Sequence, residues 1–424
     1  MATSLAAQLL VISTNSENSL NLKAQKAAHS KSLIFEPQVA ASQSLDTIYT
    51  LCHEGFQQLC LLDGRFLDFQ RDIFSEQSKD EDRTQMTSAE NSELDKRLEL
   101  FLGLVGGRLR LSPAVKAVEW LIRRFREVAK KQNDRERAAD FDSRVHERNS
   151  SFLLMTFLPY HSLNIFTTLL SILPPKLPEA YKFLHPYIRS LTSPPTHAIV
   201  HTAINNIPFT STLNSYVLRI CRTRQHYQGL IAFWAGTIIA ATAGMLEKSK
   251  SGRKAVQQQN EQDLLSRLMP TLNAALAMKK VPELRLGCYA LLSLMATNGG
   301  LDDKLLSAMM EAVALGWTSE TTVPGLACLC ALAQHRGAKQ LTKRLAKELL
   351  KVENLTTVLI DLSKERPVER LANGLCLVLV ERLMKNGDIR GLHCGTADVK
   401  RGVVHHVADP ADAVLDILLL QVAD

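Results

Sequence analysis

The sequence predicts an all-α protein built from stacked pairs of helices. Its 424 residues include 20 glycines and 15 prolines, and aromatic residues make up 6% of the chain, which disfavours a turn-rich β architecture. Leucine, alanine and other strong helix formers dominate instead. Apolar side chains recur at helical spacing along most of the chain, and no strand pattern of comparable strength accompanies them.

Three similar apolar segments repeat in the second half of the chain. They begin at Leu286, Leu326 and Leu371, and a fourth, earlier member begins at Leu230. Their spacing of about 40–45 residues falls within the period of about 40–47 typical of HEAT and armadillo repeats. Each of the three follows a proline suited to the first turn of a helix: Pro282, Pro324 and Pro367. We therefore predict an α-solenoid of HEAT/armadillo-like helical pairs that winds into a curved superhelix.

Amphipathic segments lie between these apolar ones. In each of them an apolar residue recurs about every four positions, as on one face of a helix. One segment runs through Leu301, Leu305, Met309, Val313 and Trp317, and the next through Leu341, Leu345, Leu349 and Val352. A two-layer solenoid requires this alternation, because its nearly all-apolar helix is covered by its own partner and by the adjacent repeats.

The pattern divides the chain into three parts. Residues 1–245 are predicted to form an N-terminal domain of irregular helical repeats, residues 246–263 a polar insertion or loop, and residues 264–424 HEAT-like repeats. The chain closes with an apolar run, and without a capping repeat the last helix would leave that face bare. We therefore expect the repeats to be truncated at the C-terminus.

Cysteine usage and hydropathy bear on the cellular compartment. Eight cysteines are scattered mostly through apolar runs, which in a chain of this size indicates reduced thiols in the cytosol or nucleus. The eighteen residues from Gly229 to Leu246 carry no charge and reach the threshold length of a membrane span. Basic residues flank the segment on both sides, so no orientation signal is present. The segment is either a fully buried solenoid helix or a membrane helix.

A basic stripe is predicted on the helix from Val115 to Lys131. At 100° per residue, its apolar residues fall on one side and most of its basic residues on the other. Residues 108–137 contain ten basic and four acidic side chains, an excess of six positive charges in a chain whose net charge is +7. Such a stripe suits contacts with phosphates. The alternative is a solvated face with ion pairs such as Glu119–Arg123.

The candidate RNA- or partner-binding residues come from this stripe and the turn before it. They are Arg108, Arg110, Lys116, Trp120, Arg123, Arg124, Lys130 and Lys131. Trp120 projects toward the polar side of the predicted helix, where it either packs against a neighbouring helix or offers an exposed anchor for a partner. Smaller basic clusters near Lys248 and near Lys343 carry the same ambiguity.

No motif of the sequence indicates an enzyme. The glycines at 103, 106 and 107 lack the Lys-Ser/Thr of a phosphate-binding loop, and no Gly-x-Ser-x-Gly elbow is present. A metal site could be imagined from His393, Cys394, His405 and His406, but their spacing matches no standard zinc pattern. Cys328 and Cys330 lie within one apolar helix, where both thiols would pack. We therefore predict no catalytic residue, cofactor, metal or small-molecule substrate.

Several stretches resemble one known family. They are the run from Ser32 to Ala41, the Trp-Leu-Ile-Arg-Arg-Phe at 120–125, the Leu-Pro-Tyr-His at 158–161 and the Phe-Trp-Ala-Gly-Thr-Ile-Ile at 233–239. Together they are similar to the very large HEAT-repeat protein of the small-subunit processome, the HEAT-repeat subunit of the t-UTP (UTP-A) subcomplex. The resemblance covers roughly residues 1–245; beyond that, the repeat pattern carries the assignment.

The resemblance implies a non-enzymatic scaffold in the nucleolus. It implies early assembly on pre-ribosomal RNA with small nucleolar RNA, roles in pre-18S rRNA processing and small-subunit biogenesis, and support of RNA polymerase I transcription. It also implies partners among the other t-UTP subunits, especially β-propeller proteins. Two alternatives stay open from the residues themselves. One is a direct RNA-binding module that uses the basic residues of 108–137, and the other is a transport or membrane-associated solenoid adaptor.

Overall fold

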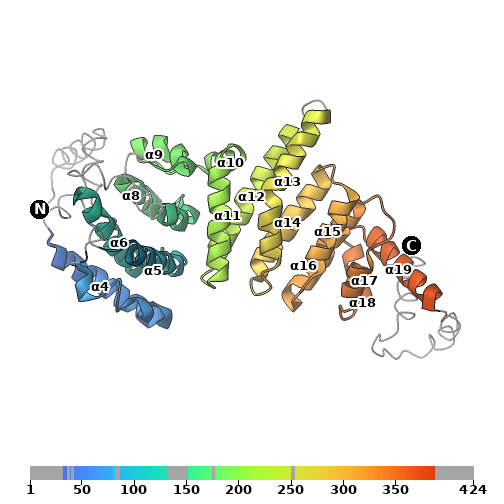
Figure 1. Ribbon diagram of the computed structural model, residues 1–424, viewed down its shortest axis with the longest axis horizontal. Coiled ribbons are helices and arrows are strands. Elements are labelled where there is room, and N and C mark those ends of the chain that lie inside the picture. The colour runs from blue at the N-terminus through green and yellow to red at the C-terminus, as the bar shows by residue number, and fades with distance from the viewer. Residues whose placement is uncertain are drawn as a thin grey trace, which may run out of the picture. The chain divides into compact units, whose positions relative to one another are not determined.

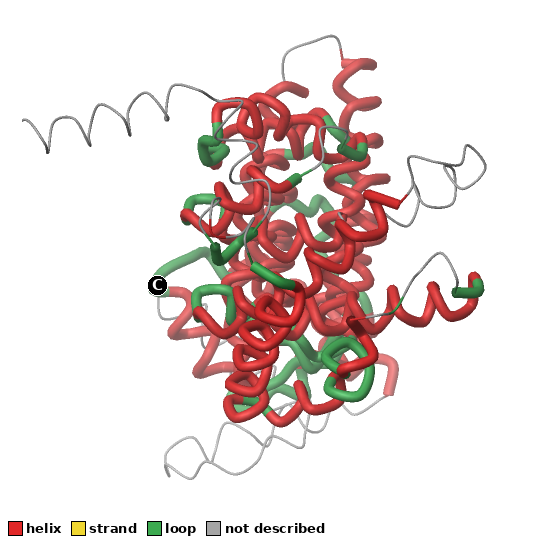
Figure 2. Tube along the Cα trace, turned by 90° about the vertical axis from the view of Figure 1, so that its left-hand side faces the viewer, coloured by secondary structure: helices red, strands yellow, loops and turns green. Residues whose placement is uncertain are grey.

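The computed structural model describes residues 32–35, 39, 43–79, 81, 86–131, 151–173, 177–249 and 254–386. Helices and the turns between them make up these residues, and none of them belongs to a strand (Figure 2). The prediction of an all-α helical-repeat fold is therefore confirmed.

The chain divides into two compact units, Met1–Trp234 and Ala235–Asp424. The division falls inside one long helix, α12 (Gln228–Ser249), whereas we predicted that the N-terminal domain would extend to residue 245. Hydropathy changes little along α12, so the sequence offered no signal for a boundary at this point.

The first unit begins with a helical pair that is closed by a short irregular segment. Its elements are α4 (Leu45–Leu62), η1 (Gly64–Phe69), η2 (Glu76–Lys79), α5 (Ser88–Gly106) and α6 (Ser112–Lys131). Ser44 caps α4 by accepting the Thr47 N–H, and Thr87 and Glu90 form a capping box at the start of α5. The buried stripe of α4 packs against α6 (Figure 1).

The rest of the first unit consists of shorter helices around an aromatic core. After a helical turn over 151–157 come η4 (Leu158–Tyr160), α8 (Asn164–Ile172), η5 (Glu179–Leu184), α9 (His185–Ser190), α10 (Thr196–Asn205) and α11 (Ile207–Arg222). Both η5 and α10 pack on α11. Inside, the Tyr216 hydroxyl lies 3.1 Å from the Thr156 hydroxyl, and the Phe209 ring is fully buried.

The second unit has the two layers that the repeats predict. Its helices are α13 (Lys254–Leu276), α14 (Pro282–Asn298), α15 (Asp303–Ala314), α16 (Ser319–Gln334), α17 (Lys343–Leu349), α18 (Leu355–Ser363) and α19 (Glu369–Asn386). The first layer is α13, α15 and α17, and the second is α14, α16 and α19. Each helix contacts its pair mate and the neighbour in its own layer (Figure 1). This is the nearest-neighbour packing of a solenoid.

The three repeated apolar segments are the second-layer helices α14, α16 and α19. Their central residues, such as Cys288, Leu329 and Leu375, are at most 1% exposed. Pro282 opens α14 as predicted. Pro324 instead lies inside α16, because a capping box of Thr318 and Thr321 starts that helix earlier.

The polar segment 246–263 is not the loop that we predicted. Helix α12 continues to Ser249, and α13 begins at Lys254, so residues 254–263 are helical. Lysine, alanine, glutamine and glutamate are strong helix formers even where no apolar stripe accompanies them. We had interpreted the absence of that stripe as the absence of a helix.

Helix α12 contains the segment for which a membrane span was the alternative. Among the described residues, Gln228–Lys248 is the one helix long and apolar enough to cross a bilayer, and 44% of that stretch is buried within the protein. The Trp234 indole N–H donates to the Asn214 side-chain oxygen over 2.8 Å, and the Thr242 side chain is fully buried. These polar contacts are those of a helix packed inside a protein.

One arginine in the second unit is completely buried. The Arg285 guanidinium donates to the carbonyl oxygens of Val313 (3.1 Å), Leu315 (2.9 Å) and Gly316 (2.5 Å), where α15 ends. Its Nε–H donates to the Tyr289 hydroxyl over 3.2 Å. The arginine therefore supplies donors to carbonyls that the end of α15 leaves without partners, and its charge opposes the negative end of the helix dipole.

Candidate partner-binding surfaces

The predicted basic helix exists as α6, but its middle is buried on all sides. Residues 117–122 are at most 5% exposed, including the Glu119 side chain, because α4 and the segment 64–79 cover them. The Glu119 carboxylate accepts the Leu33 N–H over 2.6 Å. The side chains of Arg123, Arg124, Lys130 and Lys131 lie outside the described part of the structure. The stripe beyond residue 122 therefore stays a prediction.

Trp120 is a core residue, so its assignment to partner binding is corrected. Its side chain is 1% exposed, its indole N–H donates to the Ile73 carbonyl over 3.0 Å, and its ring meets Tyr49 edge to face at 4.9 Å. The helical projection placed this ring on the polar side. The projection could not show that the irregular segment after α4 folds over that side.

Arg108 and Arg65 share one carboxylate. Asp63 accepts from Arg65 at 2.7 Å and from Arg108 at 2.5 Å, while Arg108 also donates to the Leu104 carbonyl. The Arg65 hydrogen bonds, and the charge of Arg108 to a lesser degree, lower the pKa of the Asp63 carboxyl from 3.8 to about 2. Arg108 therefore has a structural role, with 26% of its side chain exposed.

This ion-pair cluster predicts a stability change at acid pH. A carboxyl whose pKa is depressed on folding stabilises the fold above its unfolded value and ceases to do so as the pH falls toward its folded value. Wild-type protein should therefore lose part of its stability between about pH 4 and pH 2 through this group. Asp63→Asn should be less stable at pH 7 and should show a smaller change across that window. Urea midpoints at a series of pH values measure the difference. Asp361→Asn, which removes an exposed pair with Lys364, should leave the acid profile unchanged.

Three loops that are distant in sequence converge at this end of the first unit. Arg65 donates to the Arg224 carbonyl over 3.3 Å, which joins the turn after α4 to the turn after α11. The Tyr160 hydroxyl donates to the Gly106 carbonyl over 2.6 Å. A Cβ at Gly107 would lie 3.2 Å from Tyr227, so the glycines after α5 serve close packing of loops.

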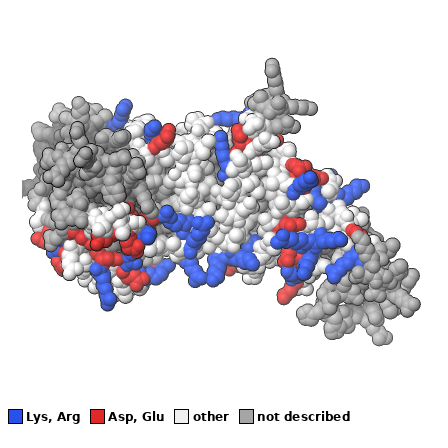
Figure 3. Space-filling view, in the orientation of Figure 1, with Lys and Arg blue, Asp and Glu red and all other residues white. Residues whose placement is uncertain are grey.

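The convergence gathers arginines that the sequence interpretation missed. Besides Arg110, which was predicted, these are Arg65, Arg222 and Arg224, and all four are exposed. Within the described residues, no carboxylate lies within ion-pair distance of Arg110, Arg222 or Arg224. Figure 3 shows Lys and Arg colouring the surface near the ends of α5 and α11 with little acidic surface between them. The missed residues fall in turns, where no periodicity relates them to one another.

Arg224 adopts a left-handed backbone conformation, with φ of 56°. The Gln225 N–H donates to the Ile220 carbonyl and the Arg224 N–H to the Cys221 carbonyl, which together form a Schellman motif. Glycine is the residue that this position favours, because a side chain there is strained.

We expect Arg224→Gly to stabilise the protein by about 0.5–1 kcal/mol, the relief of the left-handed strain less the added chain entropy. Chemical denaturation measures the change. Arg222→Gly is the matched control, because it places glycine within the right-handed last turn of the same helix and should destabilise by up to about 1 kcal/mol. A destabilising Arg224→Gly would show that the arginine side chain itself supports the turn.

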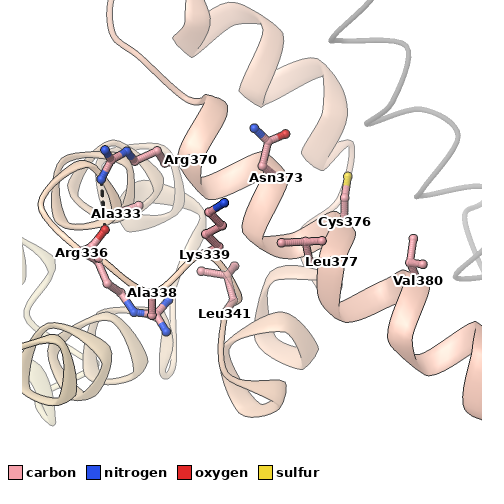
Figure 4. A pocket seen from close by; sticks show the side chains of 11 residues that line it. Ala333, Arg336, Ala338, Lys339, Leu341, Arg370, Asn373, Cys376, Leu377 and Val380 are labelled. Carbon is pink, nitrogen blue, oxygen red and sulfur yellow. Dashed lines mark hydrogen bonds between the residues drawn. The ribbon is translucent and has the colours of Figure 1, made fainter.

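The second unit carries a pocket of about 660 Å³ beside α16 and α19 (Figure 4). Leu341, Leu377 and Val380 form its apolar wall, and Arg336, Lys339 and Arg370 contribute positive charge. The buried Nε of Arg336 has no hydrogen-bond partner. Arg370 donates to the Gln334 and Arg336 carbonyls, which anchors α19 to the end of α16. No acidic residue lines the pocket, so its chemistry suits an anionic group with apolar neighbours.

The described residues contain no group of three or more His, Cys, Asp or Glu side chains placed to hold a metal ion. Burial raises the pKa values of Cys328 and Cys330 to about 12, which suits packed thiols, and the Cys328 thiol donates to the Tyr289 carbonyl. The cluster of His393, Cys394, His405 and His406 lies outside the described residues.

Comparison with known proteins decides the family. A family model described as U3 small nucleolar RNA-associated protein 10 matches residues 264–379, which run from α13 into α19. Curated proteins of that name are similar over 92% of this chain: 53% identical in Pyricularia oryzae, 49% in Neurospora crassa and 48% in Aspergillus oryzae. The chain belongs to this family. It spans about a fifth of the length of these U3 small nucleolar RNA-associated protein 10 relatives, 20–21% of each.

Proposed function

We propose that this chain is a helical-repeat part of a nucleolar scaffold that supports maturation of pre-18S rRNA and biogenesis of the small ribosomal subunit. The observation that carries the proposal is 53% identity over 392 residues to a protein named for its association with U3 small nucleolar RNA. The two-layer helical packing supports it, since stacked repeats present extended surfaces for binding.

The proposed mechanism is contact without chemistry. The family resemblance supports protein partners among the t-UTP subunits, with β-propeller proteins foremost, and a supporting role in RNA polymerase I transcription. In the structure, exposed arginines and exposed leucines in the first unit supply charge and apolar surface, the two ingredients of a protein interface.

Direct binding of RNA is the second candidate. The convergence of Arg65, Arg110 and Arg224 favours it, because unpaired guanidinium groups bind phosphates well. The described part of α6 supports it less, since Trp120 is buried and Arg108 is engaged by Asp63. A log–log plot of RNA affinity against salt with a slope near zero would exclude this candidate.

Purification of the full-length protein from cells tests the proposal. Small-subunit processome proteins, U3 small nucleolar RNA and pre-18S rRNA should be recovered with it, and the tagged protein should lie in the nucleolus. Depletion of the protein should cause precursors of 18S rRNA to accumulate. Recovery of none of these proteins or RNAs, with normal 18S rRNA maturation after depletion, would overturn the proposal.

A further inference from the structure

Four leucines are exposed together where α4 ends and α6 begins. Their exposed fractions are 89% for Leu61, 61% for Leu62, 54% for Leu67 and 42% for Leu111. Single exposed leucines are ordinary on protein surfaces, but a contiguous apolar group marks an interaction site. The buried stripe of α4 ends at Leu59, so these leucines take no part in the core of the helical pair.

Measured contacts bring the four leucines to one end of the α4–α6 pair. The two helices run antiparallel, because Tyr49 meets Trp120 while Gly55 lies against Pro113 and Lys116. The last turn of α4 therefore lies beside the turn that precedes α6. The 2.5 Å ion pair of Arg108 with Asp63 links these two turns directly. Residues 61–67 and 107–111 thus form one surface.

Arginines surround this apolar surface. The turns 61–68, 107–111 and 222–224 contain five arginines and two aspartates, an excess of three positive charges. Asp63 and the Arg224 carbonyl hold the Arg65 guanidinium in place, while 55% of its side chain stays exposed. An arginine held in this way loses little side-chain entropy on binding, and arginine is among the residues enriched at binding hot spots.

We propose that a leucine–arginine patch, made of Leu61, Leu62, Leu67, Leu111, Arg65 and Arg110, docks a segment of another protein in which apolar side chains are flanked by carboxylates. Such a segment covers the leucines and pairs with the arginines. RNA phosphates would engage the arginines and leave the leucines in water. A second copy of this chain would bring two positive patches together across a symmetric contact. The inference rests on the proposed function, because it specifies the chemistry of one scaffold partner.

Site-specific photo-crosslinking in the full-length protein tests the patch. A photoreactive phenylalanine derivative at Leu61 or Leu111 should form an adduct with one other protein in cells, and the same residue at Ile207, which is 50% exposed in the same unit, should not. The adduct should survive RNase treatment. Mass spectrometry should place it in a peptide that contains apolar residues and Asp or Glu. Adducts to RNA, to a second copy or to a lysine-rich peptide, or no adduct at all, would each overturn the proposal.

Paired variants of the 424-residue chain then measure affinity for that crosslinked peptide. Leu61→Gln with Leu62→Gln should weaken binding at least tenfold, and Arg65→Gln should weaken it and reduce its dependence on salt. The matched control, Leu163→Gln with Ile207→Gln, removes two exposed apolar side chains of the same unit and should change affinity less than twofold. Equal losses in the two pairs would overturn the proposal. Recovery of processome proteins by the full-length protein without any adduct at Leu61 would sink the patch and leave the proposed function standing.

Discussion

Replacing Arg285 with methionine should destabilise the second unit by about 3–5 kcal/mol, the range found when one member of a buried charged contact is removed. The guanidinium is fully buried and donates to three carbonyls where α15 ends. Methionine fills a similar volume but supplies no donor, so these carbonyls would be left in an apolar interior without water. The loss should therefore exceed that of an ordinary core substitution.

Two further variants separate geometry from charge at this site. Arg285→Lys keeps a positive charge but lacks the planar fork, and we expect an intermediate loss of stability. Arg344→Met removes an arginine that is 63% exposed and 3.8 Å from Glu311, and it should change stability by less than about 1 kcal/mol. Thermal and urea unfolding followed by circular dichroism compare the three. If Arg285→Met unfolds like wild type, the carbonyls of α15 have found other partners and the argument fails.

Replacing Trp120 with alanine should destabilise the first unit by about 3–5 kcal/mol, as truncation of a buried large aromatic side chain does. The ring is 1% exposed and lies against Tyr49, and its N–H binds the Ile73 carbonyl. The substitution would leave a cavity between α4 and α6 and an unsatisfied carbonyl in the segment that covers them.

Trp120→Phe serves as the conservative variant, because it keeps most of the ring volume and loses the hydrogen bond, so its cost should be well below that of alanine. Urea denaturation measures both changes. Binding at the leucine–arginine patch provides the second readout. Under conditions in which the variant stays folded, Trp120→Phe should leave that binding unchanged. Lost binding with unchanged stability would restore Trp120 as a partner-binding residue.

The candidate site shows where prediction from the chain stops. Arg110 was predicted because it precedes a helix rich in basic residues, and it is exposed. Arg108 was predicted on the same ground, yet the 2.5 Å contact with Asp63 engages it in the fold. Arg65 and Arg224 are 159 residues apart and were missed, because a helical projection relates only residues of one helix.

What the sequence by itself determined is the class of fold. Helical spacing and a repeat of about forty residues follow from local rules, so the second-layer helices α14, α16 and α19 could be located without coordinates. The tertiary structure alone decided which faces reach the solvent. Burial of Trp120 depends on the segment 64–79 folding over α6, and the convergence of Arg65 with Arg224 depends on contacts between distant turns. Such contacts have no period in the chain, because they arise only when the helices pack.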